Sequence, residues 1–200
     1  MENKIEKELK NRVKPLLEKG RTGDWQHTLR ALDYARHLLR YETGEEDIVL
    51  TTLYLHDIGW GRVDYSDFEN APPALKKDAQ SVHLHMRYGA EMAAEILEEM
   101  GCDPEKISVI TSIIAVHDIP DKVFTMDNPS AILVMEADRL DRYGPDSLNR
   151  LKQLFGEEAL VGEVMQGARA LRIKGLDEWF KTPTAKALAK KLGRETGWFK

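Results

Sequence analysis

Apolar residues recur every three or four positions along most of this chain, which is the spacing of amphipathic helices. One such stripe follows Asp24 and consists of His27, Ala31, Tyr34, Ala35 and Leu38. The alternation of apolar and polar residues that marks β-strands is scarce. The pattern therefore predicts an all-α fold, a bundle of about nine helices.

Capping residues, glycines and prolines indicate where these helices begin and end. The predicted helices cover about residues 3–20, 24–41 and 45–59, and further helices begin at Ser81, Asp103-Pro104, Asn128-Pro129 and Thr182-Pro183. Residues 59–80 break the pattern with two glycines, a Pro-Pro pair and mixed charges. A long polar loop in a compact domain is often a lid or a binding loop, so we expect this segment to influence specificity.

Length and composition limit the classes of protein to consider. The chain has 200 residues, of which 42% are hydrophobic, enough for one core, and we expect a single domain over residues 1–200. Its net charge of −5 argues against a nucleic-acid partner. No apolar run is long enough to span a membrane, the charged N-terminus does not resemble a secretion signal, and Cys102 has no partner for a disulfide. We therefore expect a cytoplasmic protein without membrane partners.

Six residues that can bind a metal lie on apolar helix faces or at predicted helix ends: His27, His56, Asp57, His85, His117 and Asp138. An unpaired imidazole or carboxylate is costly in such surroundings, so a shared cation explains them. Imidazoles and carboxylates suit a divalent Mn, Fe, Co, Ni, Zn or Mg ion.

One ion needs only part of this set. His27, His56, Asp57 and Asp138 would hold it, while His85 and His117 could hold a second ion, with Asp57 bridging the two. We place this metal-binding core at about residues 24–145, with C-terminal helices over 146–200.

Other polar residues compete for these roles. Asp141 lies one turn after Asp138, but the apolar stripe of that helix favours Asp138 as the ligand. His37 and His83 have charged or polar neighbours and no partner at useful spacing, so neither is predicted to bind metal.

His27, the pair His56-Asp57 and Asp138 resemble the H…HD…D pattern of the HD-domain metal-dependent phosphohydrolase superfamily. The segment Glu136-Ala137-Asp138-Arg139-Leu140-Asp141 is similar to the DADxLD segment of small bacterial members. The segment His85-Met86-Arg87-Tyr88-Gly89-Ala90 is similar to the HxxxGA helix start of the same superfamily. The resemblance implies a helical bundle around one or two metal ions that hydrolyses phosphomonoesters, phosphodiesters or nucleotides.

This interpretation predicts a phosphohydrolase that acts on a small phosphorylated molecule, such as a nucleotide, with a metal-activated water as the nucleophile. We expect Asp57 to bridge the ions and to orient the attacking water. Arg139 and Arg62 are expected to neutralise charge on the phosphoryl oxygens, with Lys76, Lys77 and Arg87 as weaker candidates. A homodimer is left open.

The chain also departs from its presumed relatives. Trp60 stands where many of them carry a lysine after HDIG, and we expect Arg62 to replace that lysine. His117-Asp118 takes the place of the paired histidines of HD-GYP proteins, and the GYP segment is missing, so cyclic-di-GMP is not the expected substrate. Asp118 itself is interpreted as a helix-end residue.

Two other functions remain open at this point. Four histidines and two aspartates also resemble the ligand set of HD-fold di-iron oxygenases such as myo-inositol oxygenase, which implies oxidation of a small polyol or phosphonate. The third alternative is a non-catalytic HD sensor that binds a ligand. The fold alone does not decide among them.

Overall fold

The computed structural model describes residues 4–67, 79–157 and 162–199. In these ranges the chain forms ten α-helices and one 3₁₀ helix, and no strand. The elements are α1 (Lys4–Lys19), α2 (Asp24–Leu38), α3 (Glu46–Leu55), η1 (Ile58–Arg62), α5 (Gln80–Glu99), α6 (Pro104–Ile114), α7 (Pro120–Thr125), α8 (Pro129–Leu140), α9 (Ser147–Phe155), α10 (Gly162–Glu178) and α11 (Pro183–Glu195). The predicted all-α class is confirmed.

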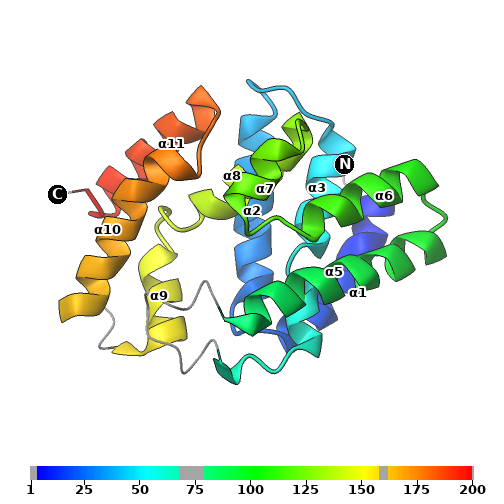
Figure 1. Ribbon diagram of the computed structural model, residues 1–200, viewed down its shortest axis with the longest axis horizontal. Helices are drawn as coiled ribbons and strands as arrows, with labels where there is room; N and C mark the ends of the chain where they lie inside the picture. The colour runs from blue at the N-terminus through cyan, green and yellow to red at the C-terminus, as the bar shows by residue number, and fades with distance from the viewer. Residues whose placement is uncertain (1–3, 68–78, 158–161, 200) are drawn as a thin grey trace.

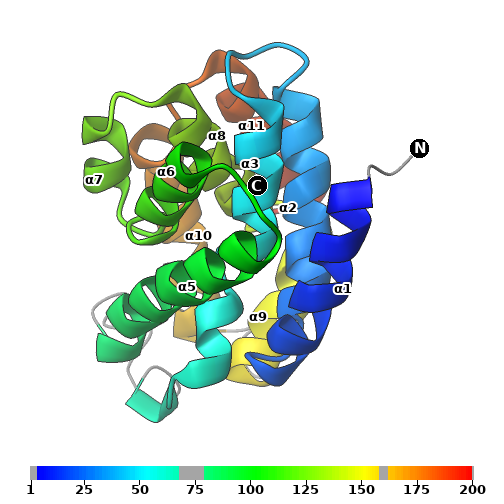
Figure 2. The ribbon, with the colours of Figure 1, turned by 90° about the vertical axis from the view of Figure 1, so that its right-hand side faces the viewer.

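Helix α2 runs through the middle of the bundle and contacts α1, α3 and α8 (Figure 1). Helices α5 and α6 lie side by side, on the opposite side of the bundle from α10 and α11 in Figure 1 and in front of them in Figure 2. One core cluster joins these parts, because it includes residues of α1, α2, α3, α5, α6, α8 and α11. None of the described helices is long and apolar enough to cross a membrane.

The predicted helix starts are present with their caps. The side chain of Asp103 accepts hydrogen bonds from the backbone N–H groups of the first turn of α6, and Asn128 does the same for α8. Thr182 caps α11 through the N–H of Ala185. Helix α7 was not predicted, although Pro120 at its first position is a usual start signal.

The C-terminal helices are tied to α8 by one buried carboxylate. Glu136 is fully buried, and its oxygens accept hydrogen bonds from the backbone N–H groups of Lys181 and Thr182 and from the Thr182 hydroxyl. These hydrogen bonds explain why an acidic residue is buried at position 136, and they need no metal ion. It also fixes where the chain turns from α10 into α11.

Gly59 in η1 permits an unusually close approach to α5. A Cβ at this position would lie 2.0 Å from the carbonyl oxygen of His85 and 2.5 Å from the N atom of Gly89. Both are backbone atoms, so the clash cannot be relieved by a side-chain rotation. Gly59 thus sets the distance between the segment that carries His56-Asp57 and the helix that carries His85.

We predict that Gly59→Ala lowers the free energy of unfolding by about 3 kcal/mol, because η1 and α5 must separate. The matched control is Gly167→Ala in α10, where a Cβ would meet nothing within 4 Å. That variant should gain up to about 1 kcal/mol from helix propensity. Urea unfolding followed by circular dichroism measures both, and equal stabilities would refute the close-packing argument.

Candidate metal centre

Four buried imidazoles converge from four different parts of the bundle. His27 lies on α2, His56 just after α3, His85 on α5 and His117 just after α6. The Nε2 atoms of His27 and His56 are 3.4 Å apart, and those of His85 and His117 are 3.5 Å apart. None of the four residues is more than 7% exposed. The structure therefore brings all four predicted histidines together as two pairs.

Asp57 lies between the two pairs. Its Oδ2 atom is 3.4 Å from Nε2 of His56 and 3.9 Å from Nε2 of His27. Its Oδ1 atom is 3.6 Å from Nε2 of His85 and 3.8 Å from Nε2 of His117. The two oxygens of one carboxylate thus face different histidine pairs, which is the arrangement of a bridging ligand.

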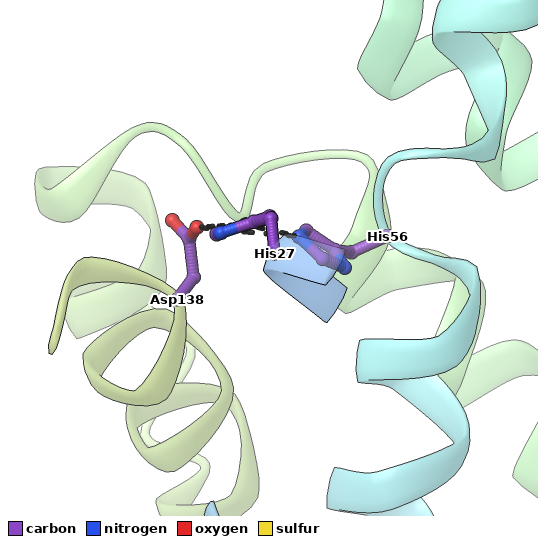
Figure 3. Close-up of side chains that lie close together, drawn as sticks. All are labelled: His27, His56 and Asp138. Atoms are coloured by element: carbon purple, nitrogen blue, oxygen red, sulfur yellow. Dashed lines mark hydrogen bonds and ion pairs between the residues drawn. The ribbon is translucent and has the colours of Figure 1, made fainter. Parts of the chain in front are cut away.

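Asp138 completes a first group of four possible ligands, which also contains His27, His56 and Asp57. Its Oδ1 atom is 3.0 Å from Nε2 of His27 and 4.0 Å from Nε2 of His56 (Figure 3). Asp141, the competing candidate, contacts the other nitrogen of His27, with its Oδ2 atom 2.8 Å from Nδ1, and it also binds Arg30. The structure therefore places Asp138 on the inner side of His27 and Asp141 on the outer side.

His56 and His117 lie on turns just after helices. The sequence predicted a helix end for His56-Asp57, although α3 stops before the predicted Gly59, whereas it placed His117 on the face of the preceding helix. Helix α3 ends at Leu55, and the Nδ1 atom of His56 donates to the carbonyl oxygen of Leu53 at 2.7 Å. Helix α6 ends at Ile114, whose carbonyl oxygen accepts from Nδ1 of His117 at 2.8 Å. Each imidazole satisfies a carbonyl that the helix end leaves without an intrahelical partner.

These outer hydrogen bonds make the residues suitable for a divalent ion. With Nδ1 as the donor, the Nε2 atoms of His27, His56 and His117 direct lone pairs to the centre. Ligands at 2.0–2.2 Å from one ion lie about 3.0–3.5 Å apart, and five of the six donor pairs among His27, His56, Asp57 and Asp138 lie 3.0–4.0 Å apart. The donor chemistry and the spacing both fit an ion of the Mn-to-Zn series.

The protonation of the metal-free centre follows from its charges. Burial lowers the pKa of His27, but hydrogen bonds to Asp138 and Asp141 outweigh burial and raise this pKa to about 10. Burial and the neighbouring His117 lower the pKa of His85 to about 3. Burial opposes ionisation of Asp57, yet His56 and Arg21 hold its pKa well below the usual range. In the metal-free centre, His27 is therefore protonated and His85 is neutral, and both lie near the ionised carboxylate of Asp57.

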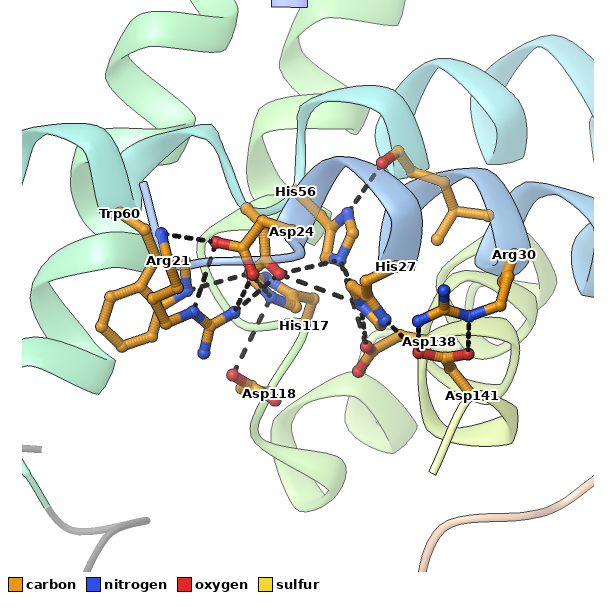
Figure 4. Close-up of polar contacts among 12 residues, drawn as sticks. Arg21, Asp24, His27, Arg30, His56, Trp60, His117, Asp118, Asp138 and Asp141 are labelled. Carbon is orange, nitrogen blue, oxygen red and sulfur yellow. Dashed lines mark hydrogen bonds and ion pairs between the residues drawn. The ribbon is translucent and has the colours of Figure 1, made fainter. Parts of the chain in front are cut away.

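Arg21 and Trp60 form part of the centre and were not predicted (Figure 4). Arg21 Nη2 donates to Asp57 Oδ2 at 2.9 Å, and its guanidinium lies 4.0 Å from the Trp60 ring centroid. Trp60 Nε1 donates to Asp57 Oδ1 at 3.1 Å, and the indole stacks on His85 at 4.1 Å. Arg21 precedes α2 in a turn, where periodicity gives no signal, whereas Trp60 was visible as a departure from relatives.

The predicted arginines have different positions. Arg139 is 4% exposed, and its Nη2 atom lies 2.6 Å from Asp118 Oδ1, while Nη1 lies 3.8 Å from Asp138 Oδ2. Arg62 does not reach the centre: its side chain is 48% exposed and pairs with Glu95 at 3.4 Å. The expectation that Arg62 replaces the missing lysine is therefore corrected, because η1 directs it to the surface of α5.

Of the remaining phosphate candidates, Arg87 lies in the described part of the chain. Arg87 is exposed on α5 and lies 3.9 Å from Glu91. Lys76 and Lys77 lie outside the described residues, as does half of the predicted specificity loop.

Asp118, interpreted from the sequence as a helix-end residue, does follow α6, but it also faces the second histidine pair. Its Oδ2 atom is 3.6 Å from Nε2 of His85 and 4.0 Å from Nε2 of His117. The dipeptide His117-Asp118 thus presents two potential ligands after a helix, as His56-Asp57 does. That parallel is the signal that could have identified Asp118.

The all-α bundle gathers histidines and aspartates from separate helices around one point, and these groups could hold a metal ion. The profile of the HD domain family matches residues 24–143, more than half of the chain, and the chain belongs to this family. No curated protein matches it.

A solved structure shares the fold: the predicted HD superfamily hydrolase from an uncultured Thermotogales bacterium. It is 21% identical, with a TM-score of 0.62, and the match covers 96% of this chain and 87% of that one. Similarity at this identity shows a common architecture over nearly the whole chain, including the helices that follow the HD domain match.

We predict that metal binding releases protons and strengthens as the pH rises. His27 is protonated at neutral pH in the metal-free protein, since its pKa is raised to about 10, and an ion must displace that proton. His85, with a pKa of about 3, is already neutral. Titration calorimetry with Mn²⁺ in buffers of different ionisation enthalpy counts the protons. An affinity unchanged between about pH 6 and about pH 8 would contradict this assignment.

We further predict that Trp60→Phe weakens Mn²⁺ binding by about tenfold, because Asp57 loses the indole N–H that orients it. Trp198→Phe is the matched control, since it also removes a buried indole bond, to Ser147 Oγ at 2.8 Å, away from the centre. Both variants should lose stability, but only the first should lose metal affinity. Equal affinities in the two proteins would show that the Trp60 bond to Asp57 is incidental.

Proposed function

We propose that this protein is a metal-dependent phosphohydrolase that acts on a small phosphoester or nucleotide. The observation that carries the proposal is that Asp57 presents opposite oxygens to two buried histidine pairs. Membership of the HD domain family supports it, and so does the likeness to a predicted HD superfamily hydrolase.

His27, His56, Asp57 and Asp138 would hold one divalent ion, and His85 and His117 would hold a second that shares Asp57. When bound, such ions lower the pKa of water and neutralise charge on phosphoryl oxygens. The protein contributes the fixed directions of the ligands. The Nδ1 bonds of His27, His56 and His117 hold three imidazole planes in place before any ion arrives.

The buried arginines have positioning roles in this proposal. The guanidinium of Arg139 contacts Asp118 and Asp138, so we propose that it orients these carboxylates rather than contacting the substrate. Arg21 holds Asp57 in the same way. Arg142 is more accessible, with a 39% exposed side chain whose Nη2 atom lies 3.7 Å from Asp118 Oδ1. Among the described residues, we propose Arg142 as the cation that meets the substrate phosphate.

We expect the purified protein, stripped with a chelator and reloaded with Mn²⁺, to release phosphate from a member of a phosphoester and nucleotide panel. His85→Gln should lower this rate by about a hundredfold, because it removes a proposed ligand. His83→Gln is the matched control, because His83 is exposed on the same helix only two residues away, and it should retain the rate.

Other outcomes would replace the proposal. Iron-dependent consumption of O₂ with a polyol or phosphonate, without phosphate release, would identify an oxygenase. Tight nucleotide binding without turnover with any divalent metal would identify a sensor. Equal phosphatase rates in the His85 and His83 variants would show that the histidine cluster is not the hydrolytic site.

A further inference from the structure

The second histidine pair has a carboxylate of its own in addition to the shared Asp57. We propose that Asp118 is a protein ligand of a second divalent ion, so that each ion is held by two histidines and two carboxylates. This inference rests on the proposed metal centre, but it does not depend on which reaction the centre catalyses.

The first group sets the standard for comparison. Its donors are Nε2 of His27 and His56, Oδ2 of Asp57 and Oδ1 of Asp138. Five of the six distances among these atoms are 3.0, 3.4, 3.4, 3.9 and 4.0 Å. The four atoms therefore surround a space of the size that one ion needs.

The second group has nearly the same dimensions when Asp118 is included. Nε2 of His85 and Nε2 of His117 are 3.5 Å apart, and they lie 3.6 and 3.8 Å from Asp57 Oδ1. Their distances to Asp118 Oδ2 are 3.6 and 4.0 Å. Asp118 is thus as close to this pair as the shared carboxylate is. Without it, the second group would have three protein donors against four in the first.

Arg139 holds Asp118 in the orientation of a ligand. Its Nη2 atom contacts Asp118 Oδ1 at 2.6 Å and donates to the Asp118 backbone carbonyl at 2.9 Å. The carboxylate therefore has one oxygen bound to the arginine and the other directed to the imidazoles. Because Arg139 also lies 3.8 Å from Asp138 Oδ2, one guanidinium orders a carboxylate of each group.

The charges agree with this assignment. Two divalent ions bring four positive charges into a buried space, and both histidine pairs are neutral when they bind metal. Asp57, Asp138 and Asp118 supply three negative charges to this space, which also contains the cations Arg21 and Arg139. A second ion without Asp118 would have only a share of Asp57 as its negative partner, which weakens binding in a site of low dielectric.

The test is metal stoichiometry, measured by equilibrium dialysis of the metal-free protein against Mn²⁺ with atomic spectroscopy. We expect the unmodified chain to bind two ions, and Asp118→Asn to weaken the second by about tenfold or more. Asp121→Asn, which removes an exposed carboxylate three residues later, is the control and should bind as the unmodified chain does. Two ions bound with unchanged affinities by Asp118→Asn would overturn the inference.

Asp118→Asn leaves the buried Arg139 without its carboxylate partner, so a second variant guards against misfolding. Asp118→Glu keeps the charge for Arg139 but moves the oxygens, and it should also lose second-ion affinity while its thermal unfolding stays cooperative. Only one ion bound by the unmodified chain would overturn the inference and leave single-metal hydrolysis intact. Two ions bound without phosphate release from any substrate would sustain the inference and refute the proposed reaction.

Discussion

The structure depends on the electrostatic problem created by burying four imidazoles and an ionised carboxylate at one point. Lone pairs on Nε2 atoms 3.4–3.5 Å apart repel each other unless a cation or a proton lies between them. In the metal-free chain, a protonated His27 donates from Nε2 to Asp138 and from Nδ1 to Asp141 and so meets part of this need, since those partners raise its pKa to about 10. Divalent ions, one at each histidine pair, would meet it fully, because every inner nitrogen could then donate its lone pair to a positive centre.

The way two helices end makes this convergence possible. Adjacent side chains inside a helix point in directions about 100° apart, so a His-Asp pair within α3 could not face one ion. By ending α3 at Leu55 and bonding His56 to the Leu53 carbonyl, the chain turns both residues inward. His117 ends α6 by the same bond to Ile114, and the close approach at Gly59 keeps the first turn against α5.

Much of this architecture could be predicted from the sequence, because its signals are local. Periodicity located most of the helices, though not α7, and Asp103, Asn128 and Thr182 marked three of the starts through caps that the structure contains. The ordered histidines and aspartates indicated the centre. Contacts between residues distant in sequence could not be predicted in this way: Arg21, in a turn, binds Asp57, and Arg62 forms an ion pair with Glu95 on another helix. The spacing of residues along the sequence shows which side chains share a face of one helix. The pairs Arg21–Asp57 and Arg62–Glu95 depend instead on how different segments pack together.

The position of Asp118 bears on the choice between hydrolysis and oxidation, which the fold leaves open. An oxygenase needs vacant positions on its metal for both O₂ and a chelating substrate. If Asp118 ligates the second ion, each ion has four protein donors, and an octahedral ion keeps only about two positions. The positions left open would be enough for the water and phosphoryl oxygens that metal-assisted phosphoryl transfer uses. Arg139 matters here because it holds Asp118 Oδ1 and leaves Oδ2 facing His85 and His117, so it would limit the chemistry that a second ion could support.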